Sequence, residues 1–228
     1  MIKVTYLSHS GFLLEMADAY FLFDYYKGEL PKLDSSKRFF VFASHIHYDH
    51  FQESIFRLRE QLPQTVYILS DDIQTEDAVN IRKIGPNQNL EVDGCRIRTL
   101  RSTDEGVAFL VTYQDRTFYH AGDLNWWHWE EEGEAYNTMM GRSYQREIHK
   151  IYDEKIDVAF VPVDPRLGEQ YCWGLDYFMR NTDTKVVFPM HFWGNYGIFG
   201  RLRLEMCTQE YESRIMDIEK EGQVFLLD

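Results

Sequence analysis

The apolar residues of the first 44 positions fall into short runs of the kind that form β-strands. Residues 2–7, 11–16 and 20–24 are separated by short turn-forming stretches, so we predict an antiparallel meander. Residues 38–44 are almost continuously apolar, which is typical of a buried strand. The chain therefore begins with β-structure that leads into the core.

Helical and β patterns alternate in the rest of the chain. Apolar residues from Phe51 to Leu62 recur at helical spacing, which predicts a helix over the buried strand. A strand at 65–69 precedes a further helix, and Asp93-Gly94 and 114–116 predict the turns of two hairpins. The remaining predicted elements are strands at 90–92, 95–100, 107–113, 117–120, 156–163, 185–190 and 224–227, and helices at about 134–153, 173–181 and 202–221. These two halves, each β-structure followed by β and α elements, predict one domain spanning residues 1–228.

Composition narrows the function classes. Aromatic residues make up 16% of the 228 residues, which excludes a disordered chain and favours a sizeable core or an aromatic pocket. The 24 basic and 37 acidic residues leave a net charge of −13, whereas a nucleic-acid binder needs a basic surface. No apolar run reaches the roughly 18 residues of a membrane helix, and the first seven residues are too polar for a signal peptide. We therefore expect a small-molecule substrate and no nucleic-acid or membrane partner. The sequence leaves open whether the protein forms a homo-oligomer.

The cysteines indicate the redox environment. Cys95, Cys172 and Cys207 are odd in number and far apart in the sequence. This pattern disfavours a disulfide framework and predicts a cytoplasmic protein.

The segment His45-Ile46-His47-Tyr48-Asp49-His50 carries the strongest chemical signal. It directly follows the predicted buried strand, and side chains two positions apart in an extended segment point the same way. His45 and His47 are thus expected to converge on one ion, while Asp49 and His50 reach a second. Imidazole and carboxylate are ligands of zinc, and also of manganese and iron.

Two distant residues extend this metal hypothesis. Asp123 follows Gly122 at the end of the strand predicted at 117–120, and His191 follows the strand at 185–190. Because three apolar strands each end in a residue of ligand type, we expect one edge of the sheets to collect the ligands.

These residues together resemble the metallo-β-lactamase superfamily. Its His-x-His-x-Asp-His signature is present as His45-x-His47-x-Asp49-His50, and Gly122-Asp123 and His191 follow in the family's order. Residues 6–14 and Phe23-Asp24 resemble its lactonase-like branch, which includes ascorbate-6-phosphate lactonase. The resemblance covers nearly the whole chain. It implies an α+β fold, a four-layer αβ/βα sandwich of two mixed β-sheets with helices outside, and a hydrolytic centre of one or two metal ions.

The resemblance also implies roles for the ligands. His45 and His47 would hold one ion, Asp49, His50 and His191 the other, and Asp123 would bridge them. A hydroxide whose pKa the metals lower would be the nucleophile. Asp49 would orient this water and serve as the catalytic proton acceptor. The implied cofactor is zinc, as one or two ions, with manganese or iron as alternatives.

One departure from the family pattern concerns the first ion. The family places a further His in the segment that is here Arg101-Ser102-Thr103-Asp104-Glu105-Gly106. Either Asp104 or Glu105 supplies an oxygen instead, which would favour a harder metal, or both are ordinary loop carboxylates. The second site does not depend on this segment.

Several residues near these strand ends are candidates for the substrate pocket. Trp127 and His128 follow Asp123 closely, and either line a pocket or pack in the core. Trp126 and Trp129 are expected in the core. Arg166 either grips an anionic substrate group or pairs with a neighbouring acid such as Asp164. His9 is expected to be a turn residue rather than a ligand.

The function that follows is a metal-dependent hydrolase of a small ester, lactone or phosphoester. The absent His leaves open a non-catalytic metal-binding or sensor module with a degenerate first site. A nuclease is the least favoured alternative because of the net negative charge.

Overall fold

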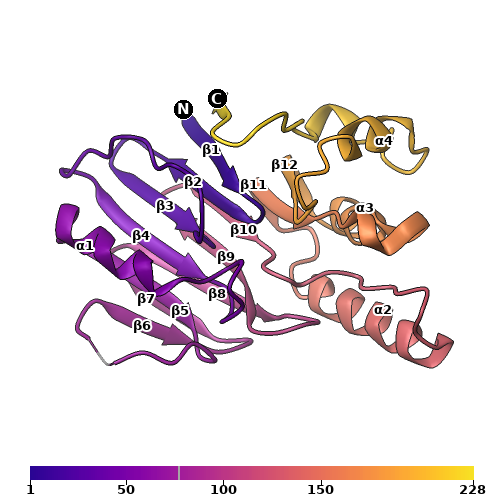
Figure 1. Ribbon diagram of the computed structural model, residues 1–228, viewed down its shortest axis with the longest axis horizontal. Helices are drawn as coiled ribbons and strands as arrows, with labels where there is room; N and C mark the ends of the chain where they lie inside the picture. The colour runs from indigo at the N-terminus through magenta and orange to yellow at the C-terminus, as the bar shows by residue number, and fades with distance from the viewer. Residues whose placement is uncertain (77) are drawn as a thin grey trace. The chain divides into compact units, whose positions relative to one another are not determined.

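The computed structural model describes residues 1–76 and 78–228, and its chain divides into two compact units (Figure 1). The first unit contains residues 1–85 and 219–228, and the second contains residues 86–218. Each unit is built on one β-sheet. The single domain that the sequence predicts over both units stays a prediction.

The first unit carries a mixed sheet whose strands change from antiparallel to parallel pairing. Its described residues form seven strands in the order β13-β1-β2-β3-β4-β5-β6. The strands are β1 (Ile2–Ser8), β2 (Gly11–Glu15), β3 (Ala19–Phe23), β4 (Arg38–Ala43), β5 (Thr65–Ser70), β6 (Ile81–Ile84) and β13 (Val224–Leu227). The predicted antiparallel meander and the closing strand are confirmed, and β3 to β6 pair in parallel.

The helix predicted over 51–62 is shorter and tighter than expected. A 3₁₀ helix at Glu53–Arg57 passes into one α-helical turn, α1 (Leu58–Gln61). The helix ends there because Leu62 precedes Pro63, and a residue before proline avoids helical backbone angles. Its apolar residues still pack as predicted, since Phe51, Ile55 and Leu62 join the core formed by one face of the sheet.

The helix predicted after the strand at 65–69 is wrong for the described residues. Residues 71–76 and 78–80 form turns and irregular chain that lead into β6, which the sequence did not predict. β6 pairs in parallel with β5, from Tyr67↔Ile81 to Ser70↔Ile84. The described residues of this short connection therefore contain no helix.

The second unit carries another mixed sheet, in which antiparallel pairing again changes to parallel pairing along the chain. Among residues 86–218, all of them described, six strands lie in the order β12-β11-β10-β9-β8-β7. The strands are β7 (Asn89–Val92), β8 (Cys95–Arg101), β9 (Val107–Tyr113), β10 (Arg116–His120), β11 (Lys155–Pro162) and β12 (Asp183–Met190). Both predicted hairpins are confirmed, and at the first one Asp93 and Gly94 adopt φ 51° and 78°, as a two-residue type I′ turn requires.

Two helices of the second unit follow the sequence patterns closely. They are α2 (Glu134–His149) and α3 (Trp173–Asn181), which lie side by side in Figure 1. The hydroxyl group of Tyr144 on α2 donates a hydrogen bond of 2.7 Å to the carbonyl oxygen of Gly174 on α3. Tyr119 of β10 stacks on Phe178 of α3, which fixes this helix to the sheet. The last predicted helix, at 202–221, does not follow its sequence pattern in this way.

The helix predicted at 202–221 is wrong in place and length. Helix α4 spans Ile198–Leu204, and the chain then continues irregularly to a short 3₁₀ helix at Glu212–Arg214. The Arg203 guanidinium replaces helical hydrogen bonds here, because it donates to the carbonyl oxygens of Glu212 (2.9 Å) and Ile215 (3.2 Å) and pairs with Asp217. These side-chain contacts stabilise irregular chain where the periodicity of the sequence predicts a helix.

The predicted fold class of two mixed β-sheets with flanking helices is confirmed. A search of the described helices found none with the length and apolar character needed to cross a bilayer. Cys172 and Cys207, which are distant in the sequence, have sulfur atoms 3.9 Å apart within the second unit.

Candidate metal centre

The candidate ligands of the first unit gather where parallel strands end. β3 and β4 pair in parallel up to Phe23↔Phe42, so the residues that follow them lie at the same edge of the sheet. Asp24 directly follows β3, while Ser44 and His45 follow β4. Asp24 has a left-handed backbone with φ 43°, a conformation that aspartate tolerates better than most residues.

Asp24 orients His50 through a buried pair of side chains. Asp24 Oδ2 lies 2.7 Å from His50 Nδ1, and both residues are almost completely buried. Ser44 also holds this carboxylate, because its backbone N–H donates to Oδ1 (2.8 Å) and its hydroxyl group donates to Oδ2 (2.6 Å). With Nδ1 held in this way, the Nε2 atom is the one that His50 presents to a ligand, as in the carboxylate–histidine pairs of metal sites.

His45 and His47 converge as the spacing predicts. Their ring nitrogens, Nε2 of His45 and Nδ1 of His47, are 3.0 Å apart. Nδ1 of His45 lies 2.9 Å from the Ser44 hydroxyl group, and the rings of His45 and His50 have centroids 4.1 Å apart. Three imidazoles of the motif are therefore neighbours within the first unit.

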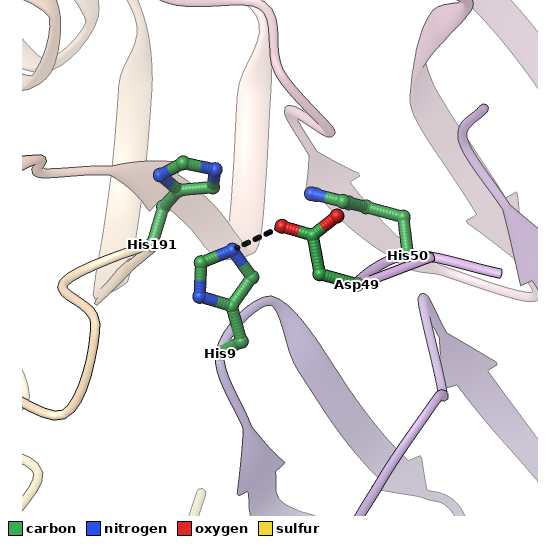
Figure 2. A group of neighbouring side chains, drawn as sticks. All are labelled: His9, Asp49, His50 and His191. Carbon is green, nitrogen blue, oxygen red and sulfur yellow. Dashed lines mark ion pairs between the residues drawn. The ribbon is translucent and has the colours of Figure 1, made fainter. Parts of the chain in front are cut away.

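Asp49 lies between two histidines in Figure 2, with His50 on one side and His9 on the other. His9 Nε2 is 3.3 Å from Asp49 Oδ2. Burial by itself would raise the pKa of the Asp49 carboxyl group. The contact with His9 and the charge of His50 outweigh burial and hold this pKa well below its usual range. Asp49 is therefore ionised at neutral pH.

The second unit contains a pair that resembles Asp24 and His50. β11 and β12 pair in parallel up to Pro162↔Met190, and Asp164 and His191 follow these two strand ends. Asp164 Oδ2 lies 2.9 Å from His191 Nδ1, and both side chains are buried. His191 has φ 62°, a left-handed backbone that turns its ring at the end of the strand.

The guanidinium of Arg166 supports Asp164. Nε of Arg166 donates to both carboxylate oxygens at 2.9 and 3.0 Å, and the Trp193 indole N–H donates at 3.2 Å. Burial favours a raised pKa for Asp164, but the hydrogen bonds from His191 and Arg166 outweigh it and hold the pKa well below its usual range. The predicted alternative for Arg166, an ion pair with Asp164, is thus present.

Asp123 faces His191 within the second unit. It follows β10 after Gly122, whose φ of 51° allows the sharp turn, and the backbone N–H of Gly122 donates to Nδ1 of His120 at 3.1 Å. Asp123 Oδ1 is 3.4 Å from His191 Nε2. The indole N–H of Trp127 donates to the Asp123 carbonyl oxygen at 3.0 Å, which holds the turn in place.

The segment that lacks the family's histidine brings a carboxylate to Asp123. Asp104 and Asp123 offer carboxylate oxygens within 4.8 Å of one another. Thr103 joins the two loops, because its hydroxyl group donates to the carbonyl oxygen of Asn125 (2.7 Å) and accepts from the N–H of the same residue (3.0 Å). Of the two alternatives, Asp104 is the residue placed beside Asp123; the described residues show no such group for Glu105.

The distances in these clusters fit a divalent cation. The contacts at Nδ1, Asp24–His50 and Asp164–His191, are 2.7 and 2.9 Å long, the usual length of charge-assisted hydrogen bonds. The contacts at Nε2, His9–Asp49 and His191–Asp123, are 3.3 and 3.4 Å long. Two ligands on a tetrahedral ion with bonds of about 2.0–2.1 Å are separated by about 3.3–3.4 Å. The donor set and its spacing therefore suit zinc or a similar ion.

The predicted pocket residues have different surroundings. Trp127 is buried, and its ring contacts His191 with centroids 5.5 Å apart. His128 lines a cavity of about 510 Å³ in the second unit, together with Trp126 and Trp173. Trp126 is half-buried and packs against α2 as expected, with its ring centroid 6.4 Å from that of Tyr144, and it also lines this cavity. Trp129 is half-buried and stacks on Trp127. Arg166 packs over the ring of Trp193.

Three residues of the two clusters escaped the sequence-based site prediction: His9, Asp24 and Asp164. His9 was expected only in a turn, and it does occupy one, but its imidazole also contacts Asp49. Asp24 and Asp164 each follow an apolar strand that pairs in parallel with the strand preceding a candidate histidine. An acidic residue after such a strand was the available signal.

Comparison with known proteins agrees with these observations. Residues 3–191 match the family model described as the Beta-lactamase superfamily domain. A UPF0173 metal-dependent hydrolase of Opitutus terrae is 26% identical over 219 residues, covering 85% of this chain and 86% of that protein.

Solved structures share the fold. Igni18, a metallo hydrolase of Ignicoccus hospitalis, has a TM-score of 0.63 at 18% identity and covers 100% of this chain and 99% of its own. The metallo-β-lactamase fold protein YhfI of Bacillus subtilis has the same TM-score and identity, with 98% of both chains covered. With a family model that matches most of its length and a His/Asp cluster at the family's motif, this chain belongs to the β-lactamase superfamily, as its sequence predicts.

Proposed function

We propose that this protein is a metal-dependent hydrolase that cleaves a small ester, lactone or phosphoester. The observation that carries the proposal is the repeated arrangement of a buried carboxylate on Nδ1 of a histidine, with a second carboxylate 3.4 Å or less from an imidazole Nε2 in each unit. Such pairs fix the tautomer and orientation of metal-ligating histidines. The relative from Opitutus terrae, whose name is metal-dependent hydrolase, supports the same class of reaction.

The proposed ligand set is the one that the family resemblance implies. The proposed ligands are His45 and His47 for one ion, Asp49, His50 and His191 for the other, and Asp123 as the bridge. Asp104 is the proposed substitute for the histidine absent from 101–106, which favours manganese or iron at the first ion if zinc is not the native metal. The second ion is proposed to be zinc.

A bound ion would polarise the substrate and lower the pKa of water at the centre. The chain's own residues supply orientation. Because its pKa is low, Asp49 stays ionised at neutral pH and accepts a hydrogen bond from the attacking water. The same low pKa makes Asp49 a weak base, so orientation of the water is its main proposed role. Asp24 and Asp164 keep His50 and His191 in the tautomer that exposes Nε2.

The test is turnover by the purified protein with and without metal. Metal-free protein is reconstituted with Zn²⁺ or Mn²⁺ and assayed against p-nitrophenyl esters, lactones and bis-p-nitrophenyl phosphate. We expect metal-dependent hydrolysis of one substrate class and a loss of about 100-fold or more in kcat for Asp49→Asn. The matched control is Asp71→Asn, an exposed residue of the first unit, which should retain wild-type turnover.

Metal binding without turnover of any substrate would contradict the hydrolase and favour the non-catalytic metal-binding or sensor module. The lactonase-like branch, a cytoplasmic location and a small-molecule substrate without nucleic-acid or membrane partner stay part of the proposal. Their support is the opening motif, the three cysteines without a disulfide and the net charge of −13.

A further inference from the structure

His9 lies outside the His45–His50 motif and outside the ligand set that the resemblance implies. His9 lies in the two-residue turn between β1 and β2, where Ser8 pairs with Gly11. It is buried, although most turn residues are solvent-exposed. Its imidazole contacts Asp49, 40 positions away in the sequence.

The backbone of His9 is held in an uncommon conformation. Its φ is 54°, in the left-handed region, and its backbone N–H donates a hydrogen bond of 2.9 Å to the hydroxyl group of Tyr6. Gly11 permits the tight turn, because a Cβ atom there would lie 3.0 Å from the carbonyl oxygen of Ser8. Strained positions of this kind cluster at functional sites. In this conformation the His9 ring lies beside Asp49.

Three donor atoms converge here within the first unit. His9, Asp49 and His50 each offer one ligand atom, and these atoms all lie within 4.8 Å of one another. The three residues are buried, and Figure 2 shows the carboxylate of Asp49 between the two rings. The rings of His9 and His50 are T-shaped, at an interplanar angle of 82°. Two nitrogens and one oxygen around a common point match the ligand types of zinc.

The length of the His9–Asp49 contact matches the spacing of two ligands on one ion. A charge-assisted hydrogen bond between imidazole and carboxylate would be about 2.7–2.9 Å long, as the Asp24–His50 pair is. The distance of 3.3 Å instead equals the separation of two ligands on one tetrahedral ion, about 3.3 Å.

We propose that His9 is a further ligand of the metal that Asp49 and His50 bind, through its Nε2 atom. This assignment rests on the proposed function, since it assumes that the motif binds a metal. It gives this ion three ligands within the first unit, two imidazole nitrogens and one carboxylate oxygen.

The test replaces His9 by asparagine, which tolerates the left-handed backbone but is too short to reach the ion. Zn²⁺ affinity is measured by competition with a chromophoric chelator, and the number of imidazole ligands by X-ray absorption of the Zn²⁺ protein. Co²⁺ substitution reports ligand loss through its visible spectrum. The matched control is His149→Asn, at an exposed position on α2. Circular dichroism and thermal unfolding of the metal-free proteins show that both variants fold.

We expect His9→Asn to bind Zn²⁺ roughly 10- to 100-fold more weakly, with one imidazole fewer and a changed Co²⁺ spectrum, while His149→Asn matches the wild type. Weaker binding with an unchanged number of imidazoles would overturn the assignment and make His9 a residue that positions Asp49. Unchanged affinity and spectrum would overturn it too. A wild-type protein that binds no metal would instead overturn the proposed function, so the two failures are distinguishable.

Discussion

Each unit contains an aspartate that holds a candidate ligand histidine, but different groups support the aspartate in the two units. In each, an aspartate after one strand holds Nδ1 of a histidine that comes after the parallel neighbouring strand: Asp24 with His50 after β3 and β4, and Asp164 with His191 after β11 and β12. Parallel pairing brings the carboxyl ends of neighbouring strands to the same edge of the sheet. Strand pairing is therefore enough to place the aspartate beside the histidine.

The difference lies in what supports each carboxylate. Asp24 receives hydrogen bonds from the backbone and hydroxyl group of Ser44, which are neutral donors. Asp164 receives them from the guanidinium of Arg166, whose side chain is 50% exposed, and from Trp193. The first pair therefore depends on buried neutral dipoles, and the second on a charge that solvent also stabilises. Loss of the aspartate should be costlier where the groups left behind cannot reach water.

Asp24→Asn tests the more buried arrangement and should have the largest effect. The amide cannot accept from both Ser44 and His50 as the carboxylate does, so His50 loses its orientation. We expect Zn²⁺ affinity to fall about 100-fold, at the upper end for residues that support metal ligands. Chelator competition measures the change, with Asp71→Asn as the exposed control in the same unit. A loss below threefold would contradict the proposed role of Asp24.

Asp164→Asn should have a smaller effect on the same measurement. Arg166 is half-exposed and regains water when the carboxylate charge is removed, so we expect a loss of about tenfold in Zn²⁺ affinity. Asp183→Asn, at the exposed start of β12, is the control. If Asp164→Asn and Asp24→Asn weaken binding equally, the supporting donors do not matter and the comparison fails.

Arg166→Gln should have the smallest effect and a defined pH dependence. The folded-state pKa of Asp164 is depressed, so this carboxylate contributes stability above its unfolded pKa of about 3.9, and that stability is lost as the pH falls through the folded pKa. Removing Arg166 raises the folded pKa toward its usual value. At pH 7 we expect the free energy of unfolding of metal-free Arg166→Gln to be about 0.5–1 kcal/mol lower than that of the wild type. This difference should shrink below about pH 4.

Urea denaturation of the metal-free proteins at several pH values measures this difference. Arg146→Gln, at an exposed position of α2, serves as the control for loss of a positive charge. A difference from the wild type that grows on acidification would show that Arg166 does not act through the Asp164 carboxylate.

The sequence predicted the strands better than the helices. Strand periodicity and turn residues are local, so the hairpin at Asp93-Gly94 and the closing strand were correct. The helix expected at 202–221 was wrong. Tyr211 and Ile215 are buried in irregular chain there, and Arg203 binds two of the carbonyl oxygens. Tertiary contacts override periodicity when they satisfy the same backbone groups.

The candidate site divides in the same way. The motif from His45 to His50 could be identified directly, because its ligand types and spacing lie within six residues. Asp24 and Asp164 could not, since each acts on a histidine 26 or 27 positions away. Their partners depend on which strands pair in parallel, a property of the sheet.

What the sequence determined by itself is the set of strands, their tight turns and the histidine-rich segment, because near neighbours along the chain encode periodicity, turn conformation and ligand spacing. Only the tertiary structure decided that the turn residue His9 contacts Asp49, that Asp24 and Asp164 hold two histidines, and that Cys172 and Cys207 are 3.9 Å apart. The physical reason is that the register and direction of strand pairing set which distant side chains share one edge of a sheet, and those follow from packing of the whole unit rather than from any single segment.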